Sequence, residues 1–142
     1  MLKRFRNQRG TALLETAITI PLVLLVTVSV FEFGRAYQTW QVITNAAREG
    51  ARVSVLPDST DADVTDAVQN YMKGGQLPNW SSAAITLERA VPFGTNTASR
   101  ITVTYGFAFT VLNPVVKLVQ SGSTVGQGTT NMSSSALMRN ES

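Results

Sequence analysis

The feature that most constrains this chain is a run of sixteen residues without a charge, Thr16 to Phe31, with the sequence TAITIPLVLLVTVSVF. Extended to residues 11–33, the run exceeds twenty positions, with Glu15 near its start. A helix needs about 20 predominantly apolar residues to cross a bilayer, and a helix satisfies its own backbone polar groups in lipid. The sequence therefore predicts a transmembrane helix over 11–33, loosened or kinked at Pro21.

The distribution of charge predicts how that helix is oriented. The head of the chain carries four basic residues and no acid: Lys3, Arg4, Arg6 and Arg9. Beyond Gly10 there are eight Lys or Arg and nine Asp or Glu, so the net charge of +3 belongs to the head. Because cytoplasmic flanks are enriched in Lys and Arg, we expect a cytoplasmic N-terminus and an exported remainder. The exported part shows no basic excess that would favour a nucleic-acid partner.

A cleaved secretory signal peptide is an alternative interpretation of the same head. Its basic and apolar regions would fit residues 1–33 in outline. The apolar run is long for such a peptide, however, and it carries Glu15 at its entry. The stretch from Ser29 to Arg35 offers no clear small-x-small cleavage site. We therefore favour a helix that stays in the membrane.

The composition excludes several classes of catalytic site. The sequence contains neither cysteine nor histidine, which rules out thiol nucleophiles, Cys/His zinc sites and histidine-based triads. Glu15, Glu32 and Glu88 lie in separate segments with no sign of convergence. The acidic run over 58–66 lacks the glycine and the terminal glutamate of an EF-hand loop, so helix capping explains it better. We expect no enzyme activity, no metal and no cofactor.

The helix is predicted to continue outside the membrane over 34–56. Aromatic and small residues recur there at gaps of three and four, as on one face of a helix: Phe33, Tyr37, Trp40, Thr44, Ala47 and Ala51. We expect this stripe to pack on the chain's own domain, and the helices of other subunits are the alternative partner. Tyr37 and Trp40 also suit a membrane interface. Glu32 and Arg35 are expected to form a weak surface pair.

Residues 57–142 are predicted to form a small α+β domain. Pro57 and Asp58 end the long helix, and a second helix follows, capped by Ser59 or Thr60 and stopped by Gly74 and Gly75. Its predicted apolar face is Val64, Ala67, Val68 and Tyr71. Alternating residues predict strands over 83–91 and 100–107, joined as a hairpin through a turn-rich linker. After an apolar segment at 115–119 and a loop at 121–130, an edge strand is expected over 129–139.

Two motifs resemble known families. The basic head followed by Gly10 and the sequence TALLE resembles the processing site of type IV prepilins, which a prepilin peptidase cuts between positions equivalent to Gly10 and Thr11. EFGRAYQTWQVITNAAREGARVSVL, over 32–56, resembles the signature of TadE-like proteins of the tight-adherence (Flp) pilus system. The major pilins of that system carry an aromatic after the glutamate, where this chain has Thr16, so the resemblance indicates a minor pseudopilin.

That resemblance implies a structural role in pilus assembly. Residues 1–10 would be a leader that is removed, and Glu15 would pair with the new amino group of Thr11, of its own or a neighbouring subunit. A carboxylate simply solvated at the headgroup level is the other interpretation of Glu15. The implied partners are the prepilin peptidase, a TadF-like sister pseudopilin, the major Flp pilin, the inner-membrane assembly platform and membrane lipid.

The implied location is the bacterial inner membrane, with the C-terminal domain in the periplasm, or outside the cell if the subunit enters the pilus. Two alternatives stay open. One is a permanently anchored single-pass protein with an extracytoplasmic binding domain. The other is a cleaved assembly factor that remains in the membrane.

Overall fold

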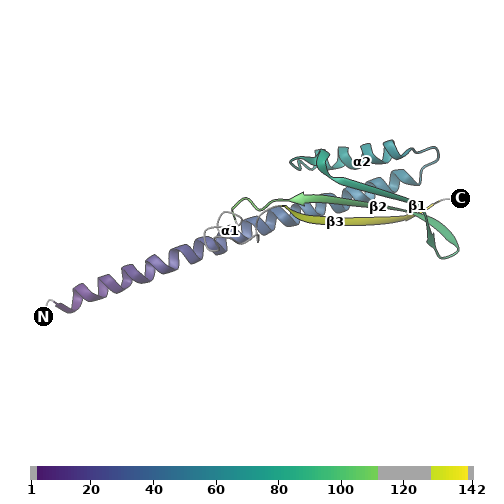
Figure 1. Ribbon diagram of the computed structural model, residues 1–142. Helices are drawn as coiled ribbons and strands as arrows, with labels where there is room; N and C mark the ends of the chain where they lie inside the picture. The colour runs from purple at the N-terminus through teal and green to yellow at the C-terminus, as the bar shows by residue number, and fades with distance from the viewer. Residues whose placement is uncertain (1–2, 112–128, 141–142) are drawn as a thin grey trace.

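The computed structural model describes residues 3–111 and 129–140, which form two helices, one short 3-10 helix and three strands. Figure 1 shows one long helix whose N-terminal half projects away from the rest of the chain, while a second helix and a sheet lie along its C-terminal half. The predicted α+β class is confirmed. The expected apolar segment at 115–119 and most of the loop at 121–130 lie outside the described residues.

The long helix α1 runs over Lys3–Ser54 and continues without a break through Pro21. At a rise of about 1.5 Å per residue, its 52 residues extend about 78 Å. The helix ends slightly before the predicted Pro57: the Leu56 N–H donates to the Val53 carbonyl in a closing turn. Asp58 follows in the left-handed conformation, with a φ of 61°, which short polar side chains tolerate better than most.

The second helix α2, Asp61–Gly74, begins with a reciprocal cap. The Thr60 hydroxyl accepts from the Asp63 N–H at 3.2 Å, and the Asp63 carboxylate accepts from the Thr60 N–H at 2.9 Å. Val64, Val68 and Met72 are buried. The predicted apolar face was wrong at its C-terminal end, since Tyr71 is 41% exposed and Met72 takes its place in the core.

The sheet consists of β1 (Ala84–Phe93), β2 (Asn96–Phe107) and β3 (Thr130–Arg139), in that order and antiparallel throughout. The turn-rich linker was predicted too long. The strands extend into it and leave only Gly94 and Thr95 between paired Phe93 and Asn96. Gly94 has a φ of 62°, which glycine adopts at no steric cost. A bulge between Glu88 and Val91 interrupts β1, and η1 (Trp80–Ser82) precedes the sheet.

The two helices cover one face of the sheet. Alternate residues of β2 point into this layer, as the period of two requires, and Ile101, Val103 and Tyr105 are buried there against side chains of α1 and α2. The tightest approach is at Gly50 of α1, where an added Cβ would lie 2.5 Å from Val68 Cγ2 and 3.2 Å from Ile101 Cγ2. Glycine at this position lets helix, helix and sheet meet.

A second glycine is also required for close packing rather than for its backbone conformation. Gly75 caps α2 with a φ of −76°, which any residue can adopt. A Cβ there would lie 2.6 Å from Val42 Cγ1 of α1. The predicted helix stop is therefore also the place where the end of α2 touches the long helix.

Candidate functional site

The N-terminal half of α1 is the most unusual surface of the molecule. Every side chain from Gly10 to Thr27 is exposed, including apolar ones such as Leu13 (72%), Leu22 (64%) and Leu24 (58%). Among the described residues, α1 is the one helix long and apolar enough to cross a membrane. So large an apolar surface on all sides of a helix is typical of a segment that lipid or other helices cover.

Four hydroxyl groups in this half are satisfied by the helix itself. Each donates to the carbonyl four residues earlier at 2.8 Å: Thr16 to Ala12, Thr19 to Glu15, Thr27 to Val23 and Ser29 to Leu25. In hydrocarbon an unsatisfied hydroxyl costs several kcal/mol, roughly 4–8 on an alkane scale. These residues therefore add no unsatisfied hydroxyl to the apolar half.

The predicted processing residues lie inside α1, as do the basic positions Lys3, Arg4, Arg6 and Arg9. Gly10 is exposed, and an added Cβ would meet no atom within 4 Å. Glycine in a helix interior costs about 0.5–1 kcal/mol relative to alanine, so Gly10 weakens the helix locally beside the Gly10–Thr11 bond. Among the described side chains, none lies close enough to Gly10 to require a glycine there.

Glu15 lies one helical turn beyond Thr11, on the same face. Its side chain is exposed, and no hydrogen bond or ion pair reaches its carboxylate from residues 10–111 or 129–140. The sequence prediction that this acid pairs with a new amino group therefore stays a prediction. The structure brings Gly10, Thr11 and Glu15 within two turns of one exposed helix.

Glu32 is a functional candidate that the sequence interpretation missed. The residue is 4% exposed, and its carboxylate accepts hydrogen bonds from Arg35 Nη1 at 3.2 Å, from the Thr110 N–H at 2.9 Å and from the Val111 N–H at 3.3 Å. Arg35 also donates to the Thr110 hydroxyl at 2.8 Å. The expected weak surface pair is thus a buried carboxylate that fastens the segment after β2 to the helix.

Aromatic rings adjoin this carboxylate. Phe109 packs edge-on against Phe33 of α1, with ring centroids 6.1 Å apart, and against Phe107 of β2 at 5.1 Å. The Arg35 guanidinium lies 5.4 Å from the centroid of the Phe107 ring, a distance at which the cation and the ring attract each other. The junction is therefore both apolar and hydrogen-bonded.

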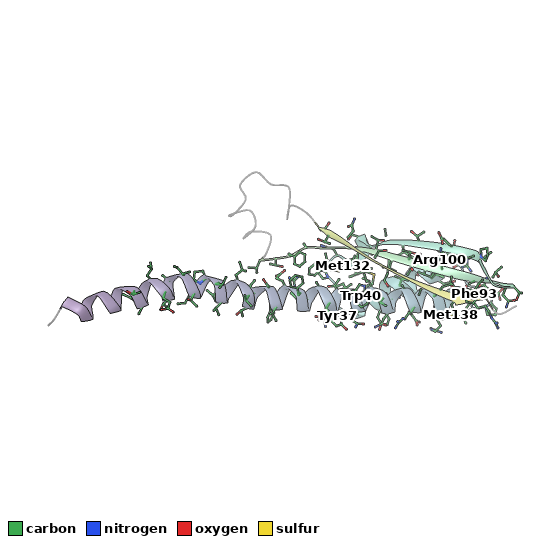
Figure 2. The ribbon with its side chains drawn as sticks, turned by 90° about the horizontal axis from the view of Figure 1, so that it is seen from below. Tyr37, Trp40, Phe93, Arg100, Met132 and Met138 are labelled. Atoms are coloured by element: carbon green, nitrogen blue, oxygen red, sulfur yellow. The ribbon has the colours of Figure 1, made fainter. Side chains whose placement is uncertain are left out.

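The predicted helix-packing stripe divides into two parts. Ala47 and Ala51 are fully buried against the domain, whereas Phe33, Tyr37 and Trp40 are 62%, 61% and 45% exposed. The buried face is displaced by one residue in its first half, and its members recur at gaps of three and four: Glu32, Ala36, Thr39, Ile43, Ala46, Ala47, Gly50, Ala51 and Ser54. In Figure 2, Tyr37 and Trp40 project from α1 at the end of the domain nearer the N-terminal half.

Hydrogen bonding and burial shift the pKa values of several groups in the domain half. Arg52 donates two hydrogen bonds to Glu49, at 2.6 and 2.9 Å, and lowers the pKa of that carboxyl. Hydrogen bonds from Thr60 lower the pKa of Asp63. Burial raises the pKa of Tyr105, whose hydroxyl donates to the Pro78 carbonyl. These shifts fit structural roles, and among the described residues no three potential ligands gather into a metal site.

One comparison with known protein families matches most of α1. Residues 10–52 match the family model of TadE-like proteins, so the resemblance predicted from the sequence motifs is confirmed over these residues. The match spans the exposed half of α1, the Glu32 and Arg35 side of the junction and most of the buried face. It supports involvement in the tight-adherence pilus system. No curated protein and no solved structure matches the chain.

Proposed function

We propose that this chain is a minor pseudopilin of the tight-adherence pilus, cleaved between Gly10 and Thr11 by a prepilin peptidase and acting in the assembly or priming of the filament. The observation that carries the proposal is the exposed apolar half of α1, with a single acid, Glu15, five residues beyond Gly10. Its match to the TadE-like family supplies the biological context.

The apolar half of α1 suits a subunit whose helix is surrounded first by lipid and later by the helices of other subunits. Side chains such as Leu13, Ile18 and Leu22 are 64–72% exposed, and they belong to the half of α1 that projects away from α2 and the sheet (Figure 1). Burying such a side chain gains about 1.5–3 kcal/mol, so the half-helix needs a covering throughout its life. Lipid supplies it before assembly, and the helices of the major pilin and a sister pseudopilin supply it afterwards.

Cleavage changes the electrostatics at one end of this surface. The leader carries Lys3, Arg4, Arg6 and Arg9, which hold the N-terminus at the cytoplasmic face. Removing it leaves an ammonium on Thr11 at the positive end of the helix dipole, where a cation is unfavourable. Glu15 lies in the first turns of the new helix and offsets that charge, within the subunit or across to a neighbour.

The deciding experiment is to determine the N-terminus of the native protein by mass spectrometry. We expect it to begin at Thr11, and an intact Met1 overturns the proposal. Gly10→Ala should leave a longer, unprocessed species. Gly34→Ala is the matched control, because Gly34 lies on the same helix and is equally free of neighbours.

A second experiment separates processing from assembly. Glu15→Gln should be cleaved normally yet fail to support piliation, because the neutral amide no longer balances the new ammonium. Glu49→Gln is the matched control, since Glu49 is an acid of α1 that pairs with Arg52 of the same helix. Normal piliation by Glu15→Gln would contradict the assigned role of that carboxylate.

A permanently anchored binding protein is the alternative from another class. A cleft of about 350 Å³ lies beside Arg35, Gln38, Gln76 and Tyr105 and would be its binding site. The same N-terminal analysis discriminates the two, because an anchor retains its first ten residues and stays with the membrane fraction. A cleaved assembly factor that stays in the membrane is distinguished by immunogold labelling, which would find no subunit in sheared pili.

A further inference from the structure

The position of the outer membrane boundary follows from the spacing of charges on α1. Glu15 and Glu32 are 17 residues apart, which is about 26 Å at 1.5 Å per residue. The hydrocarbon core of a bilayer is about 30 Å thick, and any tilt of the helix shortens its reach further. At least one of the two carboxylates must therefore lie within the core of an undeformed bilayer.

The structure distinguishes which acid can enter. Glu32 is 4% exposed, and its carboxylate accepts hydrogen bonds from two backbone N–H groups and from Arg35. Protein donors have replaced the water that would otherwise hydrate this carboxylate. A buried charge is tolerated when it is paired and hydrogen-bonded. Glu15 is exposed and receives no such bonds from residues 10–111 or 129–140. Glu32 is the acid that can lie below the surface of the lipid.

Arg35 provides the next candidate boundary. It lies 20 residues beyond Glu15, about 30 Å along the helix, which equals the thickness of the core. Its side chain is 40% exposed, so the guanidinium bonds Glu32 and Thr110 on one side and is open to solvent on the other. Arginine at the end of a span extends toward the headgroups in this way.

The side chains at this level are apolar and exposed. Phe31 and Phe33 of α1 are 76% and 62% exposed. Val111 is 40% exposed and lies beside the helix because its N–H donates to Glu32. Phe109 packs against Phe33. Together Phe31, Phe33, Phe109 and Val111 form an apolar collar continuous with the exposed half of α1.

We propose that this collar inserts into the outer leaflet of the membrane, with the bilayer boundary at Arg35, so that residues 109–111 form a second membrane contact besides the helix. The proposed occupant of the collar is lipid. The Glu32 carboxylate is a positioning group that holds the segment against the helix at this depth. The inference rests on the proposed membrane span of α1.

Depth measurement by spin labelling tests the collar directly, because the chain contains no cysteine. Single variants Leu24→Cys, Val111→Cys and Thr86→Cys would be labelled in the full-length chain and reconstituted in nanodiscs of phosphatidylethanolamine and phosphatidylglycerol. Collision with oxygen reports lipid, and collision with a water-soluble nickel chelate reports solvent. We expect oxygen to dominate at positions 24 and 111 and nickel at position 86.

The outcomes distinguish a failure of the collar from a failure of the proposed membrane span of α1. If position 24 lies in lipid and position 111 in water, the collar is wrong while the span stands. If position 24 also lies in water, the membrane span fails as well. Oxygen dominance at all three positions would reveal adsorption of the whole domain on lipid and would likewise overturn a boundary at Arg35.

The positioning role of Glu32 has its own readout. Glu32→Ala should move the label at position 111 from lipid toward water while the label at position 24 stays in lipid. Glu32→Gln, whose amide oxygen still accepts from the backbone, should restore much of the depth. Near-UV circular dichroism reports whether the domain remains folded in each variant. An unchanged depth at position 111 in a folded Glu32→Ala variant excludes the positioning role.

Discussion

The two halves of α1 are one continuous helix built for different surroundings. From Gly10 to Thr27 every side chain is exposed, whereas from Glu32 to Ser54 every third or fourth residue is buried. The first half is apolar on all sides. The second half carries its small residues on one face, where Ala46, Ala47 and Gly50 let the sheet and α2 approach. The comparison teaches that helix formation and helix burial are separate properties of this sequence.

The largest effect is expected from one substitution made in both halves. Ile43 is fully buried in the core and Ile20 is 52% exposed. Ile43→Ala should lower the free energy of unfolding of the domain by about 2–5 kcal/mol, because it leaves a cavity. Ile20→Ala should leave it unchanged. Guanidinium denaturation of the detergent-solubilised chain, followed by near-UV circular dichroism, measures both, and equal losses would break the comparison.

A smaller effect is expected from a glycine pair. A Cβ at Gly50 would lie 2.5 Å from Val68 Cγ2, whereas one at Gly34 would meet no atom within 4 Å. Both changes to alanine gain the same helix propensity, so their difference isolates overpacking, typically about 1–3 kcal/mol. Thermal unfolding of the two variants gives that difference. A Gly50→Ala variant as stable as Gly34→Ala would show that Val68 moves aside freely.

The smallest effect is expected on the pH dependence of domain stability. It arises at Asp63 of α2, the helix that packs on the C-terminal half of α1. Hydrogen bonds from Thr60 hold the pKa of Asp63 below its ordinary value. As the pH falls, the unfolded chain takes up this proton first, so the stabilisation is present above the ordinary pKa and is lost as the pH falls through the lowered one. In the Asp63→Asn variant, the free energy of unfolding of the domain should fall less steeply as the pH is lowered. Asp66→Asn, on the same helix, is the control and should retain it.

The long apolar helix and the strands could be predicted because their signals are local. The uncharged run after Glu15 and the alternation in β2 each need only neighbouring residues. The burial of Glu32 could not, because its donors Thr110 and Val111 lie 78 and 79 residues away in sequence. No periodicity marks a carboxylate that will accept backbone N–H groups from a distant loop. An acid directly beside the predicted end of a span was the available clue.

The displaced stripe has a different cause. Bulky aromatics dominate a search for helical periodicity, and Phe33, Tyr37 and Trp40 satisfy it. The structure instead buries Ala36, Thr39 and Ile43, one position off in part, because the sheet lies close to the helix and favours small side chains. The face of α1 that is buried was decided by how its side chains fit the sheet, and the shape of that sheet could not be known from the sequence.

The internal hydroxyl bonds of the exposed half bear on how such a helix could leave a bilayer. Each of these hydroxyl groups donates to a carbonyl of the same helix, so donor and acceptor would move together: Thr16, Thr19, Thr27 and Ser29. Transfer of this half-helix from fluid lipid into a bundle of protein helices therefore exchanges none of these bonds. Such a transfer would then depend on shape complementarity between the helices and on the charges near Glu15.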